Sequence, residues 1–462
     1  MLHFPAHSIF AQLSLQMKHI TYLLFAFFLM AIFFPAHAQQ NDALFKDSGW
    51  THHFQLTGII QGKSSIHAPY GGRNSLQAET EKAFSVTSTL YFGRKLWKGA
   101  SLYFNPEMAG GKGISSTLGI AGFPNGETFR IGDPEPVVYV ARFFFRQNIS
   151  LDNEHSELLD DGINQVKEKV STSRISFTLG KFGMADFFDD NNVSHDPRND
   201  FMNWALMNNG AYDYAANTRG YTYGFVVELI KPKWSLRLGT ALMPVYANGP
   251  KLDFHYFKTN SETIEWEKRY LLNQHKGTIR LLGYYNVSKA PNYDEVVAAK
   301  INGTDTSLDV VNGKKYGGKK IGFGINAEQE LSEAVNIFFR FGWNDGKMAT
   351  WAFAEIDNSL SAGLRIYGSS WKRVEDNIGI AMVSNGISSG HRNFLNAGGY
   401  GFMLGDGKLP NYARENIVEI FYQSQIFANL WATVDYQFVN HPAYNHDRGP
   451  VHLFAARISV RW

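Results

Sequence analysis

The chain has 462 residues, no cysteine and a formal net charge of +2, and Phe, Trp and Tyr make up 15% of it. The lack of cysteine excludes disulfide bonds and thiolate metal sites, and the near-zero net charge does not favour a nucleic-acid partner. Beyond the N-terminal region, no segment has 18 consecutive apolar residues, which excludes a membrane-spanning helix there.

The N-terminal segment has the pattern of an export signal. Lys18 precedes an apolar run from Tyr22 to Phe34, and the run is followed by Ala36-His37-Ala38. A basic residue, an apolar stretch and a small-x-small cleavage site predict a signal peptide at residues 1–38. A membrane anchor is the alternative, but it would need an apolar run of about 20 residues. The residues before Met17 contain no Lys or Arg, so translation from Met17 would give a better signal peptide.

After a polar leader at residues 39–50, the sequence predicts a single domain at residues 51–462 that is built from short strands. Several segments alternate between large apolar residues and polar residues, which is the pattern of a strand with two different faces. Turn residues separate these segments. The apolar faces of four of them are Ala100, Leu102 and Phe104; Tyr139, Ala141, Phe143 and Phe145; Val335, Ile337, Phe339, Phe341 and Trp343; and Ala432, Val434, Tyr436 and Phe438.

The opposite faces carry isolated charges rather than many lysines, as in the series Val140, Arg142, Phe144 and Arg146. In a transmembrane barrel, lipid contacts the apolar face, a water-filled lumen contacts the polar face, and the sheet closes so that every backbone group is paired. We therefore predict an all-β fold, a transmembrane antiparallel β-barrel of the outer membrane. It has about 16 strands, with 18 as the alternative, and short helical segments in inward or capping loops. A secreted β-sandwich or propeller is the competing fold.

The last ten residues favour the barrel over the sandwich. One side of this segment is apolar, and the other side, which includes Arg457 and Arg461, is largely polar. The chain then ends on Trp462. A terminal strand of this kind resembles the sorting signal that outer-membrane barrels present to their assembly machinery. The apolar side consists of Phe454, Ala456, Ile458, Val460 and Trp462.

The stretch from Gly180 to Gly224 is too polar for a core and too aromatic for a disordered linker. Asp196 followed by Pro197 predicts the start of a helix within it. Because a helix between two barrel strands cannot lie in the lipid-facing wall, we predict that residues 186–217 fold into the lumen and narrow it. A cap over the barrel is the alternative. A second helical piece is predicted at residues 163–170. One face of the first helix would consist of Phe201, Trp204, Ala205 and Asn208.

The sequence offers two other candidate sites, a Ca²⁺ site and an active site for lipid cleavage. Acidic and amide oxygens in the Gly180–Gly224 stretch are typical ligands of Ca²⁺, but their spacing is not that of an EF-hand loop. Ser384 and Asn385 near His391 are residue types that a lipid-cleaving barrel enzyme uses, but no nucleophile-elbow pattern is present. We therefore predict no enzyme activity, no metal site and no cofactor. The oxygen-bearing residues are Asp186, Asp189, Asp190, Asn191 and Asn192.

The inferred lumen faces carry more arginine than acid. Arginine offers a planar fork of donors to hydroxyl and carboxylate oxygens, and aromatic faces stack on sugar rings. These residue types therefore predict a wall that conducts sugars, whereas pairing across strands to brace the barrel is the alternative role. The predicted pore-lining residues are Arg94, Glu107, Arg142, Arg237, Arg340, Glu228, Glu419, Trp204, Asp186, Asn191 and Arg457.

Several motifs give the sequence a resemblance to the OprB-type carbohydrate-selective porins. The longest run of motifs lies between Phe182 and Tyr214. The motifs are Gly180-Lys181-Phe182, Asp186-Phe187-Phe188-Asp189, Asn191, His195-Asp196-Pro197, Asp200 to Trp204, Asp213-Tyr214, Thr218-Arg219-Gly220, Tyr223 to Glu228, Arg237 to Gly239, Trp343-Asn344 with Gly346, Glu415-Asn416, Glu419 to Tyr422, Asp435 to Gln437 and His441 to Asn445.

The resemblance covers residues 51–462 and implies a 16-stranded barrel in the outer membrane of a Gram-negative bacterium. It implies passive diffusion of small sugars through a pore that an inward-folded region narrows and that Arg, acidic and aromatic side chains line. The expected partners are sugars, outer-membrane lipid and the barrel assembly machinery, with the barrel as a monomer or a homotrimer. The competing functions are a general or anion-preferring porin, a barrel enzyme acting on lipid, and a structural or adhesin barrel.

Overall fold

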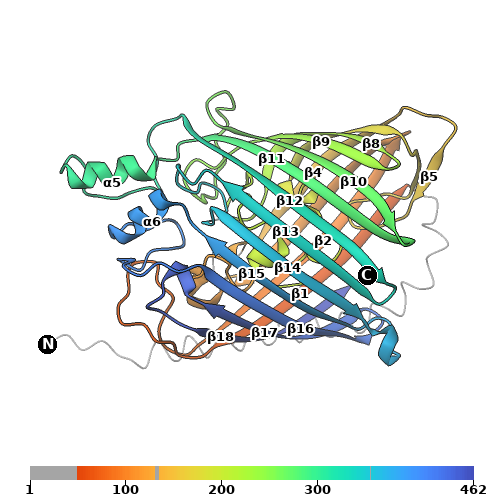
Figure 1. Cartoon of the computed structure of the whole chain (residues 1–462). Helices are drawn as coiled ribbons and strands as arrows, with labels where there is room; N and C mark the ends of the chain where they lie inside the picture. The colour runs from red at the N-terminus through yellow and green to blue at the C-terminus, as the bar shows by residue number, and fades with distance from the viewer. Residues whose placement is uncertain (1–48, 131–134, 354) are drawn as a thin grey trace. The chain divides into compact units, whose positions relative to one another are not determined.

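The computed structural model describes residues 49–130, 135–353 and 355–462; the predicted signal peptide and nearly all of the predicted leader lie outside these ranges. Sixteen strands form a closed antiparallel barrel, and their order around the wall follows the chain (Figure 1). The predicted 16-stranded barrel is confirmed. The wall strands are β1 (Trp50–Lys63), β2 (Glu81–Trp97), β3 (Ala100–Gly111), β4 (Val137–Ser150), β7 (Arg174–Phe182), β8 (Thr222–Lys231), β9 (Trp234–Ala241), β10 (Asn260–Leu272), β11 (His275–Ser288), β12 (Gly318–Ser332), β13 (Val335–Asn344), β14 (Asn358–Tyr367), β15 (Asn377–Gly386), β16 (Glu415–Phe427), β17 (Leu430–Asn440) and β18 (Val451–Arg461).

The wall closes where the last strand meets the first. The backbone N–H of Phe54 donates to the carbonyl of Trp462 at 3.1 Å, and the N–H of Trp462 donates back at 3.2 Å. The two aromatic rings lie 4.4 Å apart between centroids. On β18, Phe454 is 62% exposed on the outer face, whereas Arg457 is fully buried on the inner face. The alternation that the sequence shows in this strand therefore separates the outer surface from the lumen.

The alternation fails in the first half of β4. Asn105 of β3 pairs with Arg142, but the next residue, Pro106, pairs with Val140, so Ala141 is an extra residue in the ladder. Pro106 has no N–H to donate, and a bulge at such a position reverses the faces of the residues before it. Ala141 is buried, Val140 points outward and Tyr139 bonds to Glu107 on the inner face, so the predicted faces of these three residues are wrong.

Two-residue turns and the connection between β4 and β7 lie at one end of the barrel, and the connections that carry α-helices lie at the other. Two residues join β2 to β3, β8 to β9, β10 to β11, β12 to β13 and β16 to β17. At the other end, long connections carry the helices α5 (Tyr293–Ile301) and α6 (Ser389–Asn396), which lie side by side (Figure 1). Among the residues that the structure describes, no helix is long and apolar enough to cross a membrane. The remaining helices are α4 (Trp204–Met207) and the 3₁₀ turns η1 (Ile114–Thr117), η2 (Thr128–Arg130), η3 (Met184–Asp186), η4 (Gly368–Trp371) and η5 (Pro442–Tyr444).

The connection between β4 and β7 forms a hairpin of β5 (Ser156–Leu159) and β6 (Glu168–Ser171), so the helix predicted at residues 163–170 is wrong. Contacts with the inner wall fix the tip of this hairpin instead. Asn164 accepts a hydrogen bond from the amide of Asn105 at 2.8 Å, and the N–H of Val166 donates to the hydroxyl of Tyr103 at 3.2 Å. These long-range contacts outweigh the local helix preference of the segment.

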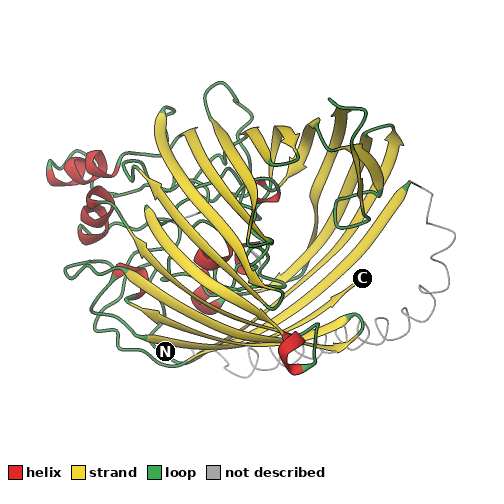
Figure 2. Cartoon of the chain, turned by 45° about the vertical axis from the view of Figure 1, so that its right-hand side comes forward, coloured by secondary structure: helices red, strands yellow, loops and turns green. Residues whose placement is uncertain are grey.

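The hydrophobic core lies inside the barrel, where short helices and loops occupy the lumen (Figure 2). Its centre is a stack of aromatic side chains from three connections at the long-loop end. The rings of Phe123 and Trp204 are 5.0 Å apart, those of Trp204 and Phe353 are 4.7 Å apart, and those of Tyr214 and Phe353 are 5.3 Å apart. The stack holds loops within the lumen that would otherwise leave a wide aqueous channel.

Candidate functional site

The connection between β7 and β8 enters the lumen and contacts the wall on several sides; we call residues 183–221 the crossing segment. Its residue Asp189 bonds to Arg340 of β13, and its residue Arg198 bonds to Glu107 of β3. The segment therefore lies inside the barrel, as predicted for residues 186–217, and does not form a cap.

The helix in the crossing segment is shorter than the sequence predicts. Residues 196–200 form a turn, and α4 begins only at Trp204, with the side chain of Asn203 accepting the N–H of Ala205 at 3.0 Å as the N-cap. Both carboxylate oxygens of Glu419, on β16, accept backbone N–H groups of the segment, at 2.5 Å from Met202 and 2.9 Å from Asn203. Glu419 thus fixes the two residues that precede α4. Tertiary contacts, and not the Asp196-Pro197 pair, therefore determine where the helix begins.

Five of the predicted pore-lining residues are buried and fasten the crossing segment to the wall or to itself. Arg340 donates to Asp189 and to the carbonyls of residues 194 and 206. Arg457 donates to the carbonyls of residues 197 and 200. Buried charges require such partners because desolvation would otherwise be costly. The five residues are Glu107, Asn191, Arg340, Glu419 and Arg457.

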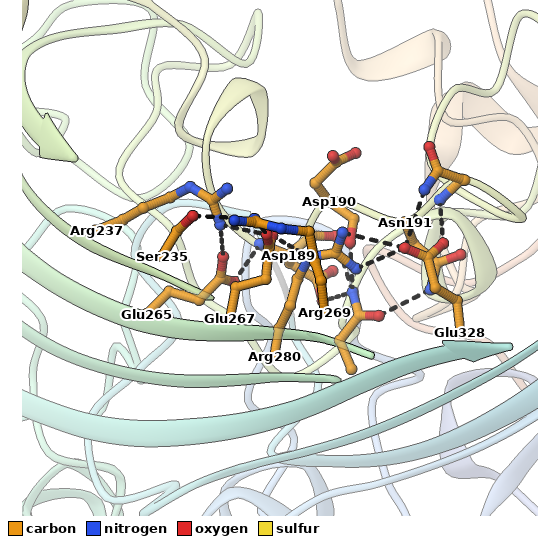
Figure 3. Close-up of polar contacts among 12 residues, drawn as sticks. Asp189, Asp190, Asn191, Ser235, Arg237, Glu265, Glu267, Arg269, Arg280 and Glu328 are labelled. Atoms are coloured by element: carbon orange, nitrogen blue, oxygen red, sulfur yellow. Dashed lines mark hydrogen bonds and ion pairs between the residues drawn. The ribbon is translucent and has the colours of Figure 1, made fainter. Parts of the chain in front are cut away.

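Arg237 and Glu228, two further predicted residues, belong to a ladder of alternating charges on the inner face of β8 to β12. Figure 3 shows Arg237 with the other members of the ladder, Glu265, Glu267, Arg280 and Glu328. Arg237 lies 3.1 Å from Glu228, 2.9 Å from Glu265 and 3.0 Å from Glu267. Glu267 also pairs with Arg280, which pairs with Glu328. This is the bracing arrangement that the sequence left open as an alternative.

Arg94 does not reach the lumen. It has the same parity on β2 as Leu90 and Phe92, which are exposed on the outer face, whereas Tyr91 and Gly93 point inward. The remaining three predicted pore-lining residues are Arg142, Asp186 and Trp204.

These three residues line one cavity of about 380 Å³ between β1, β2, β4 and the crossing segment. Arg142 donates two hydrogen bonds to the carboxylate of Asp186, one of 2.7 Å from Nε and one of 2.5 Å from Nη2. The guanidinium of Arg142 also lies over the ring of Tyr221, 5.1 Å from its centroid. We call this space the lumen cavity. Other lining residues are Tyr91, Arg146, Asn164, Gln165, Phe187, His195, Asp196, Arg198, Asn208 and Phe353.

Arg198 is a cavity residue that the sequence did not single out. It donates to Glu127 at 2.8 Å and to Glu107 at 2.9 Å, and all three side chains are buried. Burial alone would lower the pKa of Arg198, but the two glutamates hold that pKa well above its usual value. The position of Arg198 within the Gly180–Gly224 stretch is the sequence feature that could have identified it. Its acidic partners lie 71 and 91 residues away, so no local pattern indicates the pairing.

Three lining residues of the cavity carry a buried nitrogen that has no hydrogen-bond partner in the described residues. They are Nδ1 of His195, Nε1 of Trp204 and Nδ2 of Asn208. All three belong to the crossing segment. Buried polar atoms normally have a partner, so three unpartnered nitrogens on lining residues of one cavity make these residues candidates for hydrogen bonds to a polar guest.

In the described residues, side chains named for the metal and enzyme alternatives have other partners, such as Arg340 for Asp189. Among residues 49–130, 135–353 and 355–462, no group of three or more His, Cys, Asp or Glu side chains is arranged to hold a metal ion. Ser384 has the outward parity of Ile380 and Met382 on β15 and accepts a hydrogen bond from Arg414 at 2.8 Å. His391 is buried in α6, 3.1 Å from an aspartate of another loop. Serine and histidine therefore do not form a catalytic pair.

Comparison with known proteins agrees with this architecture. The sequence model of the family described as "Carbohydrate-selective porin, OprB family" matches residues 73–462. A search of curated protein sequences returns no match. The chain is similar to the high-pH structure of OprB from Pseudomonas putida, with a TM-score of 0.69 and 16% identity over 91% of this chain and 96% of that chain. For the low-pH structure of the same protein, the TM-score is 0.51 and the identity 11%, over 93% and 98% of the two chains.

Proposed function

The chain belongs to the OprB family of carbohydrate-selective porins, and we propose that sugars cross its barrel through the lumen cavity. As a member of this family, the protein is a channel of the Gram-negative outer membrane through which sugars diffuse passively, and it is not an enzyme. The part that the sequence and the family leave open is which residues meet the sugar.

The cluster of unpartnered nitrogens on His195, Trp204 and Asn208 carries this proposal. A sugar presents hydroxyl groups that accept and donate, and it satisfies these atoms once their side chains turn toward the cavity, because each nitrogen exposes less than 1 Å² in the structure. The paired side chains of Arg142 and Asp186 add donors and acceptors on the facing side. A volume of about 380 Å³ lies within the range of roughly 300–1,000 Å³ that is usual for small-molecule sites.

Residence in the cavity is brief, because conduction requires sites from which the solute leaves readily. The unpartnered nitrogens suit this requirement, since each contributes one neutral hydrogen bond of about 0.5–1.5 kcal/mol. The buried residues Glu107, Arg340, Glu419 and Arg457 act on the sugar only indirectly, by holding the crossing segment in place. Arg237 and Glu228 brace the opposite wall.

Replacing Trp204 by Phe tests the assignment, because it removes the Nε1 donor and keeps an aromatic ring. In planar bilayers, the sugar concentration that half-blocks the single-channel current should rise about three- to tenfold, which corresponds to one hydrogen bond. Trp343→Phe is the control, since Trp343 is exposed on the outer face. Equal block of wild type and Trp204→Phe would show that sugars do not contact this part of the lumen.

In the described residues, acidic partners offset much of the positive charge that a general anion-preferring porin would place around its lumen. Five inward-facing arginines contact carboxylates, and those contacts neutralise their charge. This pairing supports selectivity by hydrogen bonding over selectivity by charge. The arginines are Arg142, Arg237, Arg280, Arg340 and Arg365.

The two terminal regions of the chain serve export and assembly. Residues 1–38 direct secretion and are removed, residues 39–50 form a short leader, and residues 51–462 form the single porin domain. The terminal strand, with Phe454 outward and Trp462 at the closure, is the part recognised by the barrel assembly machinery. The apolar outer face contacts lipid, in a monomer or a homotrimer.

A further inference from the structure

One arginine of the lumen cavity has no acidic partner. Arg142 pairs with Asp186, and Arg198 pairs with Glu107 and a second glutamate. Arg146, four residues further along β4 than Arg142, forms no ion pair with any described residue. Its two hydrogen bonds are long, at 3.4 Å from Nε to a threonine hydroxyl and 3.3 Å from Nη1 to the carbonyl of Asn164.

Aromatic rings surround the charge of Arg146 without neutralising it. The guanidinium carbon lies 5.5 Å from the ring centroid of Tyr103, 5.4 Å from that of Phe144 and 5.9 Å from that of Phe187. Such contacts position a cation and offset part of its desolvation, but they leave its full positive charge. The side chain is only partly buried and lines the cavity, so a guest can reach it.

The acidic groups of the cavity are already engaged. Asp186 accepts both hydrogen bonds of Arg142 and the N–H of Gly183. Asp196 accepts the N–H of Arg198 and the amide of a neighbouring asparagine. The cavity thus has a cation with no ion-pair partner among the described residues toward the hairpin tip, whereas both of its carboxylates already accept two or more hydrogen bonds.

From this asymmetry we infer that the cavity prefers acidic sugars, such as uronic acids, over neutral sugars of the same size. The carboxylate of the sugar binds the fork of Arg146, which suits two parallel hydrogen bonds. The hydroxyl groups of the same sugar bond to the unpartnered nitrogens of His195, Trp204 and Asn208 once these side chains turn toward the cavity. This inference rests on the proposed function, in which sugars pass through this cavity.

The test compares block of the single-channel current by glucose, glucuronate and acetate, using the full-length mature protein in planar bilayers. For wild type, half-block should need about tenfold less glucuronate than glucose, as a charge-assisted hydrogen-bonded pair allows. The ratio should fall to about one in Arg146→Gln. Raising the salt concentration should weaken block by glucuronate and leave block by glucose unchanged, because salt screens only the charged contact.

Two variants separate charge from structure. Arg146→Lys keeps the cation and loses the fork, so a reduced preference for glucuronate should remain; this variant also serves if Arg146→Gln does not fold. Arg373→Gln removes an arginine from an exposed turn outside the cavity, and its ratio should equal that of wild type.

Three results would overturn the inference. Equal block by glucose and glucuronate in wild type would refute the acidic preference and leave the sugar path in place. Block by acetate as strong as block by glucuronate would show a simple anion site. Absence of block by either sugar would refute the proposed path together with the inference.

Discussion

Removal of the buried anchor Arg340 should release the crossing segment while the wall stays intact. In Arg340→Met, the segment loses a 3.2 Å bond to the Asp189 carboxylate, a 3.0 Å bond to the carbonyl of Leu206 and a 2.7 Å bond to that of Ser194. Asp189 then remains buried with only the Asn326 amide and a backbone N–H as partners. Breaking one side of a buried ion pair costs about 3–5 kcal/mol.

That loss falls on the segment, because the wall ladder of β12, β13 and β14 uses backbone bonds that the substitution leaves in place. We therefore expect a larger and noisier single-channel conductance, and faster liposome swelling with trisaccharides than wild type shows. Adding Asp189→Asn should recover part of the wild-type behaviour, since it removes the unpaired charge.

Arg269→Met is the matched control. Arg269 is also an arginine on the inner face, but its partners, among them Glu267 and the Ser235 hydroxyl, all belong to wall strands or their turns. It should keep wild-type conductance and size limit. If Arg340→Met conducts and selects like Arg269→Met, the crossing segment is not held by this anchor and the reasoning fails.

Three further predictions concern the loops, the cavity and the closure. Burial raises the pKa of Glu355, in the connection between β13 and β14, to about 7, whereas the carboxyl group in the unfolded chain has a pKa of about 4.3. Because the folded state binds the proton more tightly, the free energy of unfolding should rise by roughly 3 kcal/mol as pH falls from 8 to 5. In Glu355→Gln, the melting temperature should depend less on pH. Asp186→Asn frees the charge of Arg142 in the cavity, so the reversal potential in a salt gradient should shift toward anion selectivity, and an unchanged potential would contradict the pairing. Deleting Trp462 removes its two backbone bonds to Phe54, and folded barrel in the outer membrane, measured by heat-modifiable gel mobility, should decrease.

The wall could be predicted from sequence because lipid imposes a rule that acts residue by residue. Strands β13, β17 and β18 each show the predicted faces, since every second side chain must be apolar where it meets the membrane. The rule fails at Ala141, where a bulge opposite Pro106 depends on the register between two strands. The sequence of either strand alone does not determine the register between the two.

The site could be predicted in part. The Gly180–Gly224 stretch was identified as the segment that enters the lumen, and Arg142, Asp186 and Trp204 line the cavity there. The division of the other charges into anchors and braces could not be foreseen, because partners such as Asn203 and Glu419 are 216 residues apart. One sequence carries no signal for such pairs, so the unpaired state of Arg146 appears only in the structure.

The bonds from Arg457 to the carbonyls of Pro197 and Asp200 also bear on how the chain reaches its native state. Arg457 and Pro197 are 260 residues apart, and Arg457 lies on the strand that closes the ring. Contacts of such high sequence separation slow folding, since the intervening chain must be ordered before they form. The pairing of β18 with β1 closes the wall, and the same strand brings Arg457 to the crossing segment in the lumen. An unfinished barrel has neither a closed edge nor a fixed interior, and both appear together when the last strand arrives.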